Sequence, residues 1–339
     1  VVAALRKGIS IEKIYRLSSI EPWFLEKINN IVEIETRLKS SPLNQKLLST
    51  AKKFGFSDKQ IGRAVNKEEL EVRKIRKDFG IIPAVKQIDT LAAEWPAETN
   101  YLYLTYGGTE NDISIASADS GIIVLGAGPY RIGSSVEFDW GTVNMVWGLQ
   151  DGGQKNVVVV NCNPETVSTD YDICNRLYFE ELTLERILDI SEFEKPKGIV
   201  TSVGGQTANN LTPKLADSGI TLIGTKAEDV DRAENRSKFS QVMDRLHIRQ
   251  PSWQTFTSIT DAKNFALEVG YPVLVRPSYV LSGAAMKVVW SQTGLKKFVD
   301  EATIVSPDHP VVITKFMLDA LEVDVDGICD GKNVAIGAL

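Results

Sequence analysis

Glycine and polar residues follow three short apolar runs in the middle of the chain. The runs cover residues 122–125, 156–161 and 198–203, and they alternate with helix signals. A glycine loop that leads into a helix can present backbone N–H groups to an anion, and open parallel sheets bind ligands at the carboxyl ends of their strands. We therefore predict a ligand-binding edge. Its candidate substrate and phosphate contacts are Gly126, Gly128, Arg131, Asn163, Glu165, Thr166, Gly204, Gly205 and Gln206.

The first of these loops also resembles a dinucleotide cradle. A Rossmann fingerprint requires an acidic residue at the end of the second strand, where it holds the ribose. That run ends here in Asn161, and the spacing from Gly128 to Gly133 is longer than in the fingerprint. The pattern therefore argues against a nicotinamide oxidoreductase. A measurement that finds no NAD binding would exclude this function. In either case the glycines permit a tight turn.

Charged residues near the end of the chain could bind a nucleotide. Arg276 ends an apolar run and precedes a loop that contains Ser282 and Gly283. An arginine in this position could hold phosphate oxygens through two parallel hydrogen bonds, and the loop has the glycine freedom to close over phosphates. The alternative is an arginine paired with a nearby carboxylate. Lys315 ends a later apolar run and could reach an adenine or a phosphate, although alone it is uninformative.

Carboxylates at alternate positions follow Lys315. Glu322, Asp324 and Asp326 lie in the range 321–329, which we predict to be a strand. Alternate residues of a strand share one face, so these three could contact a ribose or a Mg²⁺-nucleotide. Spacing alone favours the other interpretation, an exposed acidic face.

The composition is that of a globular protein. Of the 339 residues, 43% are hydrophobic and 24% are charged. The sequence contains no run of about 18 apolar residues, so no membrane span is predicted. Two histidines argue against a His-based metal site or a Ser-His-Asp triad. Three cysteines without a CxxC suit a reducing compartment; we expect the cytoplasm and leave the mitochondrion open. The chain does not begin with Met, so we expect a piece of a longer polypeptide.

Charge and hydrophobic pattern divide the chain into segments. Residues 1–100 carry 18 Lys+Arg and 13 Asp+Glu, while the remainder carries 20 and 31, which supports a boundary near residue 100. The predicted segments are an all-helical domain over 1–100, a connector over 101–120, an α/β domain with a parallel sheet over 121–239 and an α+β unit over 240–339. A fourth strand of the α/β domain is predicted at 221–223. The acidic remainder does not favour nucleic acid as a partner.

Residues 56–80 have the outline of a helix-turn-helix. A helix, a break near Asn66 and a second helix follow one another. Its basic face would consist of Arg73, Lys74, Arg76 and Lys77. A DNA-binding regulator is therefore an alternative, but we favour a solvated helix face, because glutamates alternate with these cations.

Taken together, several motifs resemble the large chain of carbamoyl-phosphate synthetase. They are residues 22–26, 85–94, 125–140, 160–172, 204–207, 231–234 and 275–280. The forms Asn163-Pro-Glu-Thr-Val-Ser-Thr-Asp170 and Arg276-Pro-Ser-Tyr are similar to the second synthetase half, and Tyr130 and Trp140 have a eukaryote-like context. The resemblance spans essentially all residues. It implies a multidomain chain: a helical oligomerisation domain, a Rossmann-like pre-ATP-grasp domain and an incomplete ATP-grasp domain.

The resemblance also implies an activity. Such enzymes use ATP and Mg²⁺, or Mn²⁺, to phosphorylate carbamate made from bicarbonate and ammonia, and a glutamine amidotransferase subunit or domain supplies the ammonia. The positions that match the family's ATP site are Arg236, Arg276, Lys315, Met317 and Glu322, with Arg276 as the catalytic candidate. Bacterial members often have a histidine at the position of Lys315. The metal ligands are expected beyond Leu339, with none in this chain.

The resemblance leaves a second function open. The helical domain implies a homo-oligomer, and this piece could be an assembly module that is inactive by itself. The pathway, arginine or pyrimidine synthesis, is not distinguished.

Overall fold

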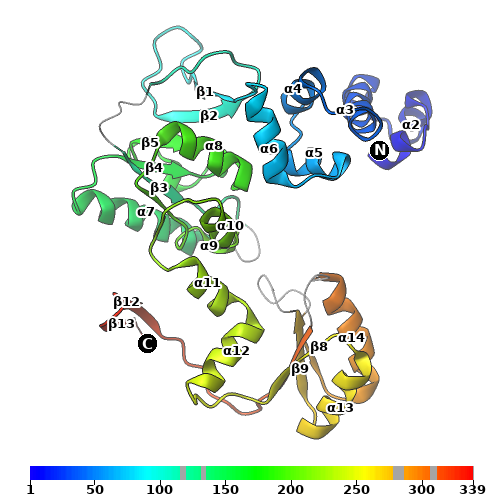
Figure 1. Ribbon diagram of the computed structural model, residues 1–339, viewed down its shortest axis with the longest axis vertical. Helices are drawn as coiled ribbons and strands as arrows, with labels where there is room; N and C mark the ends of the chain where they lie inside the picture. The colour runs from blue at the N-terminus through cyan, green and yellow to red at the C-terminus, as the bar shows by residue number, and fades with distance from the viewer. Residues whose placement is uncertain (115–119, 131–134, 278–285, 306–310, 339) are drawn as a thin grey trace. The chain divides into compact units, whose positions relative to one another are not determined.

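The computed structural model describes residues 1–114, 120–130, 135–277, 286–305 and 311–338. The chain folds into two compact units, Val1–Ala227 and Glu228–Leu339 (Figure 1). Within the described ranges, no helix is both long and apolar enough to cross a membrane.

Helices form the first part of the Val1–Ala227 unit. Their bounds are α1 Val2–Arg6, α2 Ile11–Ser18, α3 Pro22–Ser40, α4 Gln45–Lys53, α5 Asp58–Val65 and α6 Glu69–Asp78. Leu25 of α3 packs with α1 and α2 in one core, and Leu38 of the same helix packs with α4, α5 and α6 in another. The long helix α3 therefore supplies both cores with apolar side chains at helical spacing.

A parallel sheet forms the second part of this unit. Its strands are β1 Ala84–Gln87, β2 Tyr101–Thr105, β3 Ile122–Leu125, β4 Val157–Val160, β5 Arg176–Tyr178, β6 Gly198–Val200 and β7 Leu222–Ile223. The strand order is β1-β2-β5-β4-β3-β6-β7, and all neighbours are parallel except β1 and β2. The strands predicted from the apolar runs are confirmed as β3, β4, β6 and β7.

Two sequence-based boundaries were wrong. Residues 84–87 were predicted to be helical and form β1, and residues 101–105 were assigned to a connector and form β2. Leu102 and Leu104 of β2 point into the core while Tyr103 is exposed, which is the alternation of a half-buried strand. The segment predicted as a connector therefore contributes a strand to the sheet.

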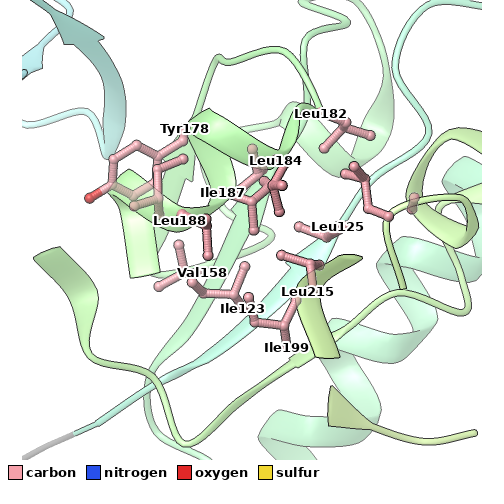
Figure 2. Close-up of a cluster of buried hydrophobic side chains, with 14 of the residues drawn as sticks. Ile123, Leu125, Val158, Tyr178, Leu182, Leu184, Ile187, Leu188, Ile199 and Leu215 are labelled. Atoms are coloured by element: carbon pink, nitrogen blue, oxygen red, sulfur yellow. The ribbon is translucent and has the colours of Figure 1, made fainter. Parts of the chain in front are cut away.

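Helices cover both faces of the sheet, as predicted. They are α7 Val136–Asp151, α8 Leu184–Glu194, α9 Gly205–Asn209 and α10 Thr212–Asp217. Figure 2 shows one face, where Ile123 and Val158 lie in the same core as Ile187 of α8. On the other face, Val124 packs in a core with Val146 of α7.

The Glu228–Leu339 unit is built around an antiparallel sheet. Its elements are α12 Arg236–Arg245, β8 Trp253–Phe256, α13 Ile259–Val269, β9 Val273–Pro277, β10 Lys287–Val289, α14 Gln292–Val305 and β11 Val311–Lys315, after α11 Ala227–Glu234. The strand order is β10-β9-β11-β8. Val275 and Ile313 of the sheet pack against Ala266 of α13 and Leu295 of α14.

A separate hairpin follows, formed by β12 Asp326–Cys329 and β13 Val334–Ala338. The strand predicted at 321–329 is therefore shorter than expected. Glu322 and Asp324 precede it and are exposed, so only Asp326 of the three alternating carboxylates lies in a strand.

Arg73 and Arg76 of α6 are buried, which contradicts the sequence-based placement of these two arginines on an exposed basic face. Arg76 is fully buried and pairs with Asp58 of α5 at 3.0 Å and with Asp189 of α8 at 3.1 Å. Arg73 also donates to Asp189. The predicted basic face is therefore divided: Lys74 and Lys77 are exposed, as the interpretation as a solvated face expects, while Arg73 and Arg76 are not. The arginines face α8 because its carboxylates offer charge-assisted hydrogen bonds in a site away from water.

Lys52 of α4 extends this buried charge network. Its amine lies 2.9 Å from a carboxylate oxygen of Asp58 and 2.6 Å from one of Glu185 in α8. Burial raises the pKa of Glu185, but Lys52 and the backbone N–H of Asp58 outweigh it and hold the pKa below its usual value. Tyr106 donates its hydroxyl to Glu185 at 3.0 Å, and the Lys52 amine lies 5.0 Å from the centre of its ring. The network thus links α4, α5 and α6 to α8.

Replacement of Asp189 should test how much this network contributes to the free energy of unfolding. Asp189→Asn leaves two buried arginines short of a counter-charge, and breaking a buried ion pair costs about 3–5 kcal/mol. We expect a loss of that order in the free energy of unfolding, measured by urea denaturation. The matched control is Glu192→Gln, which removes a half-exposed carboxylate that pairs with Arg73 and Lys77 and should cost less than about 1 kcal/mol. Equal losses in the two variants would contradict this interpretation.

Candidate functional site

A pocket of about 460 Å³ lies in the Glu228–Leu339 unit, between α12 and the strands β9 and β11. Its cationic side chains are Arg236, Arg249, Arg276 and Lys315. Its apolar walls include Phe239, Met243, Leu274 and Met317. Among the described residues, no Asp or Glu lines it. Of the predicted nucleotide-binding residues, the structure therefore brings together Arg236, Arg276, Lys315 and Met317.

Strand and helix periodicity position these side chains. Alternate residues of a strand point to opposite faces, so Val273 and Val275 of β9 join the core under α13 and α14 while Leu274 and Arg276 line the pocket. On α12, Phe239 and Met243 follow Arg236 at intervals of three and seven, which places all three on one face of the helix.

Arg276 is a partly buried cation, and the described residues of the pocket offer it no counter-ion. Its Nη2 donates to the Thr314 hydroxyl at 3.1 Å, and its buried Nε has no hydrogen-bond partner among the described residues. Among the described residues, no carboxylate forms a salt bridge with Arg276 or Arg236. Burial, together with the charge of Arg236, lowers the pKa of Arg276. Two like charges around an apolar pocket are electrostatically unfavourable unless an anion binds between them.

Lys315 and Met317 differ in how free they are to contact a ligand. The Lys315 amine donates to the backbone oxygens of Gly270 at 2.9 Å and Tyr271 at 3.1 Å, so two of its three hydrogens hold the end of α13 against β11. Met317 is 57% exposed and presents an adaptable apolar side chain to the pocket opening.

Some predicted site residues are not in this pocket. Glu322 is exposed and does not line it. Arg131, Ser282 and Gly283 lie outside the described residues.

The loops of the parallel sheet are brought together at one edge, as predicted, and Asn161 organises them. Its side-chain oxygen accepts from the backbone N–H of Gly128 and of Asn163, both at 3.0 Å, and the side chain is 1% exposed. Asn163 in turn accepts from the backbone N–H of Glu165 at 3.1 Å. Asn161 therefore occupies the position of the ribose-binding acid of a dinucleotide fold. Its side chain forms hydrogen bonds with the loops of the protein itself.

The third loop packs against the first. A Cβ on Gly204 would lie 2.4 Å from the backbone oxygen of Leu125 and 2.5 Å from that of Gly126. Gly205 has φ +65° and sits under the Phe138 ring of α7. These glycines are needed because no side chain fits between the loops.

Three polar side chains of this edge are open to solvent. Glu165 is exposed, and Thr166 and Gln206 are half-buried. The Thr166 hydroxyl lies 2.6 Å from that of Tyr130. These side chains remain candidates for substrate contact.

Sequence reasoning missed Phe239, Met243, Arg249 and Thr314. The spacing of Phe239 and Met243 from Arg236 was a usable signal, since three residues at helical intervals share a face. Thr314 had no such signal, because its place beside Arg276 results from the pairing of β9 with β11. Within the described part of the chain, no group of His, Cys, Asp or Glu side chains could hold a metal ion.

Family models match three consecutive parts of the chain. Residues 1–80 match the carbamoyl-phosphate synthetase large chain oligomerisation domain, residues 118–232 match the carbamoyl phosphate synthase preATP-grasp domain, and residues 235–338 match the carbamoyl-phosphate synthase L chain ATP binding domain.

Longer relatives match nearly the whole chain. The mitochondrial arginine-specific carbamoyl phosphate synthase large chain of Neurospora crassa is 50% identical over 99% of this chain and 29% of its own length. The carbamoyl phosphate synthase large chain of Hyperthermus butylicus is 50% identical over 97% of this chain and 31% of its own. Multifunctional protein CAD of Squalus acanthias is 48% identical over 99% of this chain and 15% of its own. The chain thus spans less than a third of these relatives, and fungal and archaeal sequences match it equally well. The domain matches and these identities show that the chain belongs to the carbamoyl-phosphate synthetase large-chain family.

Proposed function

We propose that the polypeptide containing this chain uses ATP to phosphorylate carbamate, and that the Glu228–Leu339 unit supplies part of the ATP site as the N-terminal portion of an ATP-grasp domain. The observation that carries the proposal is the partly buried Arg276, which lines the same pocket as Arg236, and the described residues of this pocket include no acid. A polyanion is the ligand that such a pocket stabilises. The matched ATP binding domain supports ATP as that anion.

The pocket suits both ends of a nucleotide. Phosphoryl transfer needs clustered positive charge around the transferred group and little covalent work by the protein. Arg236 and Arg276 supply that charge. Phe239, Met243 and Met317 offer an aromatic and two soft apolar surfaces on which a purine ring can pack.

Mg²⁺, or Mn²⁺, would accompany the nucleotide in this reaction. These ions take oxygen ligands, mainly carboxylates. The described residues of the pocket offer none, so they do not fit the metal.

The remaining participants follow from family membership. We propose bicarbonate and ammonia as the other substrates, a glutamine amidotransferase subunit or domain as the partner that supplies ammonia, and arginine or pyrimidine synthesis as the pathway. The relative named as arginine-specific supports arginine synthesis as the pathway. The cytoplasm is the proposed location, with the mitochondrion as the alternative that the Neurospora crassa relative supports.

Removal of the Arg276 guanidinium should weaken nucleotide binding. Hydrogen bonds to charged groups are worth about 1.5–3 kcal/mol, so Arg276→Ala should raise the dissociation constant of ATP by about 10- to 100-fold. Isothermal titration of the full polypeptide measures this change. The synthesis of ATP from carbamoyl phosphate and ADP should slow strongly as well.

Lys296→Ala is the matched control. It removes the same charge from an exposed position on α14 and should leave the affinity unchanged. Near-normal affinity for ATP and near-normal ATP synthesis in Arg276→Ala would contradict the assignment of this pocket to the ATP site.

A second function, assembly, is favoured by an exposed apolar surface on α3. Trp23 and Phe24 are 57% and 56% exposed and their rings meet edge to face at 5.0 Å. Ile31 lies two turns after Phe24 and is 44% exposed. We call these three residues the α3 apolar surface. Residues of this kind gathered on one face are typical of an interface, and the matched domain is described as one of oligomerisation. We propose that a second copy of the chain covers this surface.

Charges on the α3 apolar surface should separate the copies. The double variant Phe24→Lys, Ile31→Lys should lower the mass measured by sedimentation velocity, because a buried lysine without a partner disfavours association. The control is Leu246→Lys, Leu267→Lys, which charges two exposed leucines of the other unit. A mass that stays at the wild-type value in both variants, or falls equally in both, would refute the role of this surface.

A further inference from the structure

We infer that Thr314 is the positioning residue of the pocket: its hydroxyl holds the Arg276 guanidinium toward the ligand without neutralising its charge. The inference rests on the proposed function, because it takes Arg276 as a residue that binds phosphate oxygens of the nucleotide.

Thr314 is a fixed acceptor. Its backbone lies in the middle of the sheet, opposite Trp253 of β8 and Leu274 of β9, and the residue is 8% exposed. A β-branched side chain on a strand has few χ1 choices. The hydroxyl oxygen therefore has few alternative positions, and it lies 3.1 Å from Nη2 of Arg276.

The sheet geometry explains why these two residues meet. Arg276 pairs with Val312 in the register of β9 and β11. Thr314 is two residues further along β11, so it lies on the same face as Val312. The arginine side chain extends diagonally across this face to reach it, within the range of a long side chain and a diagonal neighbour.

A neutral acceptor has a specific advantage here. A carboxylate in the place of Thr314 would also orient the guanidinium, but it would cancel the charge that an anion needs. A hydroxyl orients one nitrogen and leaves the charge intact. Nε of Arg276 also has no hydrogen-bond partner among the described residues, so the hydroxyl of Thr314 is the acceptor that orients this guanidinium within the described part of the chain.

The next residue of β11 performs a different task. Lys315 donates to the backbone oxygens of Gly270 and Tyr271 and so secures the wall of the pocket. Thr314 orients the cation, while Lys315 fixes the loop beside it.

Two substitutions of Thr314 distinguish a role in positioning Arg276 from a role in packing. Thr314→Val keeps the shape and strand preference of threonine but removes the acceptor. It should weaken the binding of a fluorescent ATP analogue to the full polypeptide by about 5- to 20-fold. Thr314→Ser restores the hydroxyl and should bind within about 3-fold of wild type. Thr314→Ala provides the same comparison if the valine variant does not fold.

Adenosine serves as the matched probe, since it lacks phosphates. Its affinity should change by less than about 2-fold in Thr314→Val. Loss of ATP-analogue binding with adenosine binding retained, and rescue by serine, supports the inference. Wild-type affinity for the analogue in Thr314→Val overturns it. So does an equal loss for analogue and adenosine, because that result indicates a packing role.

The proposed function fails in a distinguishable way. If Arg276→Ala leaves ATP binding unchanged, the assignment of the pocket is wrong. If Arg276→Ala weakens binding and Thr314→Val does not, the pocket is correctly assigned and only the positioning role of Thr314 is wrong.

Discussion

The buried charge network between the N-terminal helices and α8 is the interaction on which the Val1–Ala227 unit depends. Lys52, Arg73 and Arg76 meet Asp58, Glu185 and Asp189 away from water. Within the described part of the chain, the apolar cores of these helices contain no residue of α8. The ion pairs therefore contribute to holding the helices against α8. Such pairs tolerate little displacement, because a buried charge that loses its partner is strongly destabilising.

The same residue type has the opposite role in the other unit. Arg76 is surrounded by carboxylates and is structural, whereas Arg276 has a hydroxyl as its acceptor and is available to an anion. Arg76 is fully buried and Arg276 is partly buried, but the main difference between them lies in their partners. A cation that is surrounded by acids contributes to the stability of the fold. A cation without acidic neighbours can instead bind an anionic ligand.

How far the sequence predicts the structure depends on how local the signal is. The strands β3 and β4 are runs of apolar residues that are fully buried, so their pattern alone identified them. β1, β2 and β5 interrupt their apolar residues with polar or half-exposed ones, and they were missed or placed in a connector. Asn161 was correctly judged incompatible with a dinucleotide site, but its role as an acceptor for two loops required the loops to be adjacent.

The sequence by itself determined the family, the alternation of strands and helices, and the candidate residues Arg236, Arg276, Lys315 and Met317, because motifs and periodicity are local properties of the chain. Tertiary structure decided what each charge does. The arginines of α6 looked like an exposed basic face until α8, more than a hundred residues away in the chain, supplied the carboxylates. Glu322 was predicted to lie in a strand, but the strand begins only at Asp326. A side chain's partners come from the pairing of distant segments, and no local pattern contains that information.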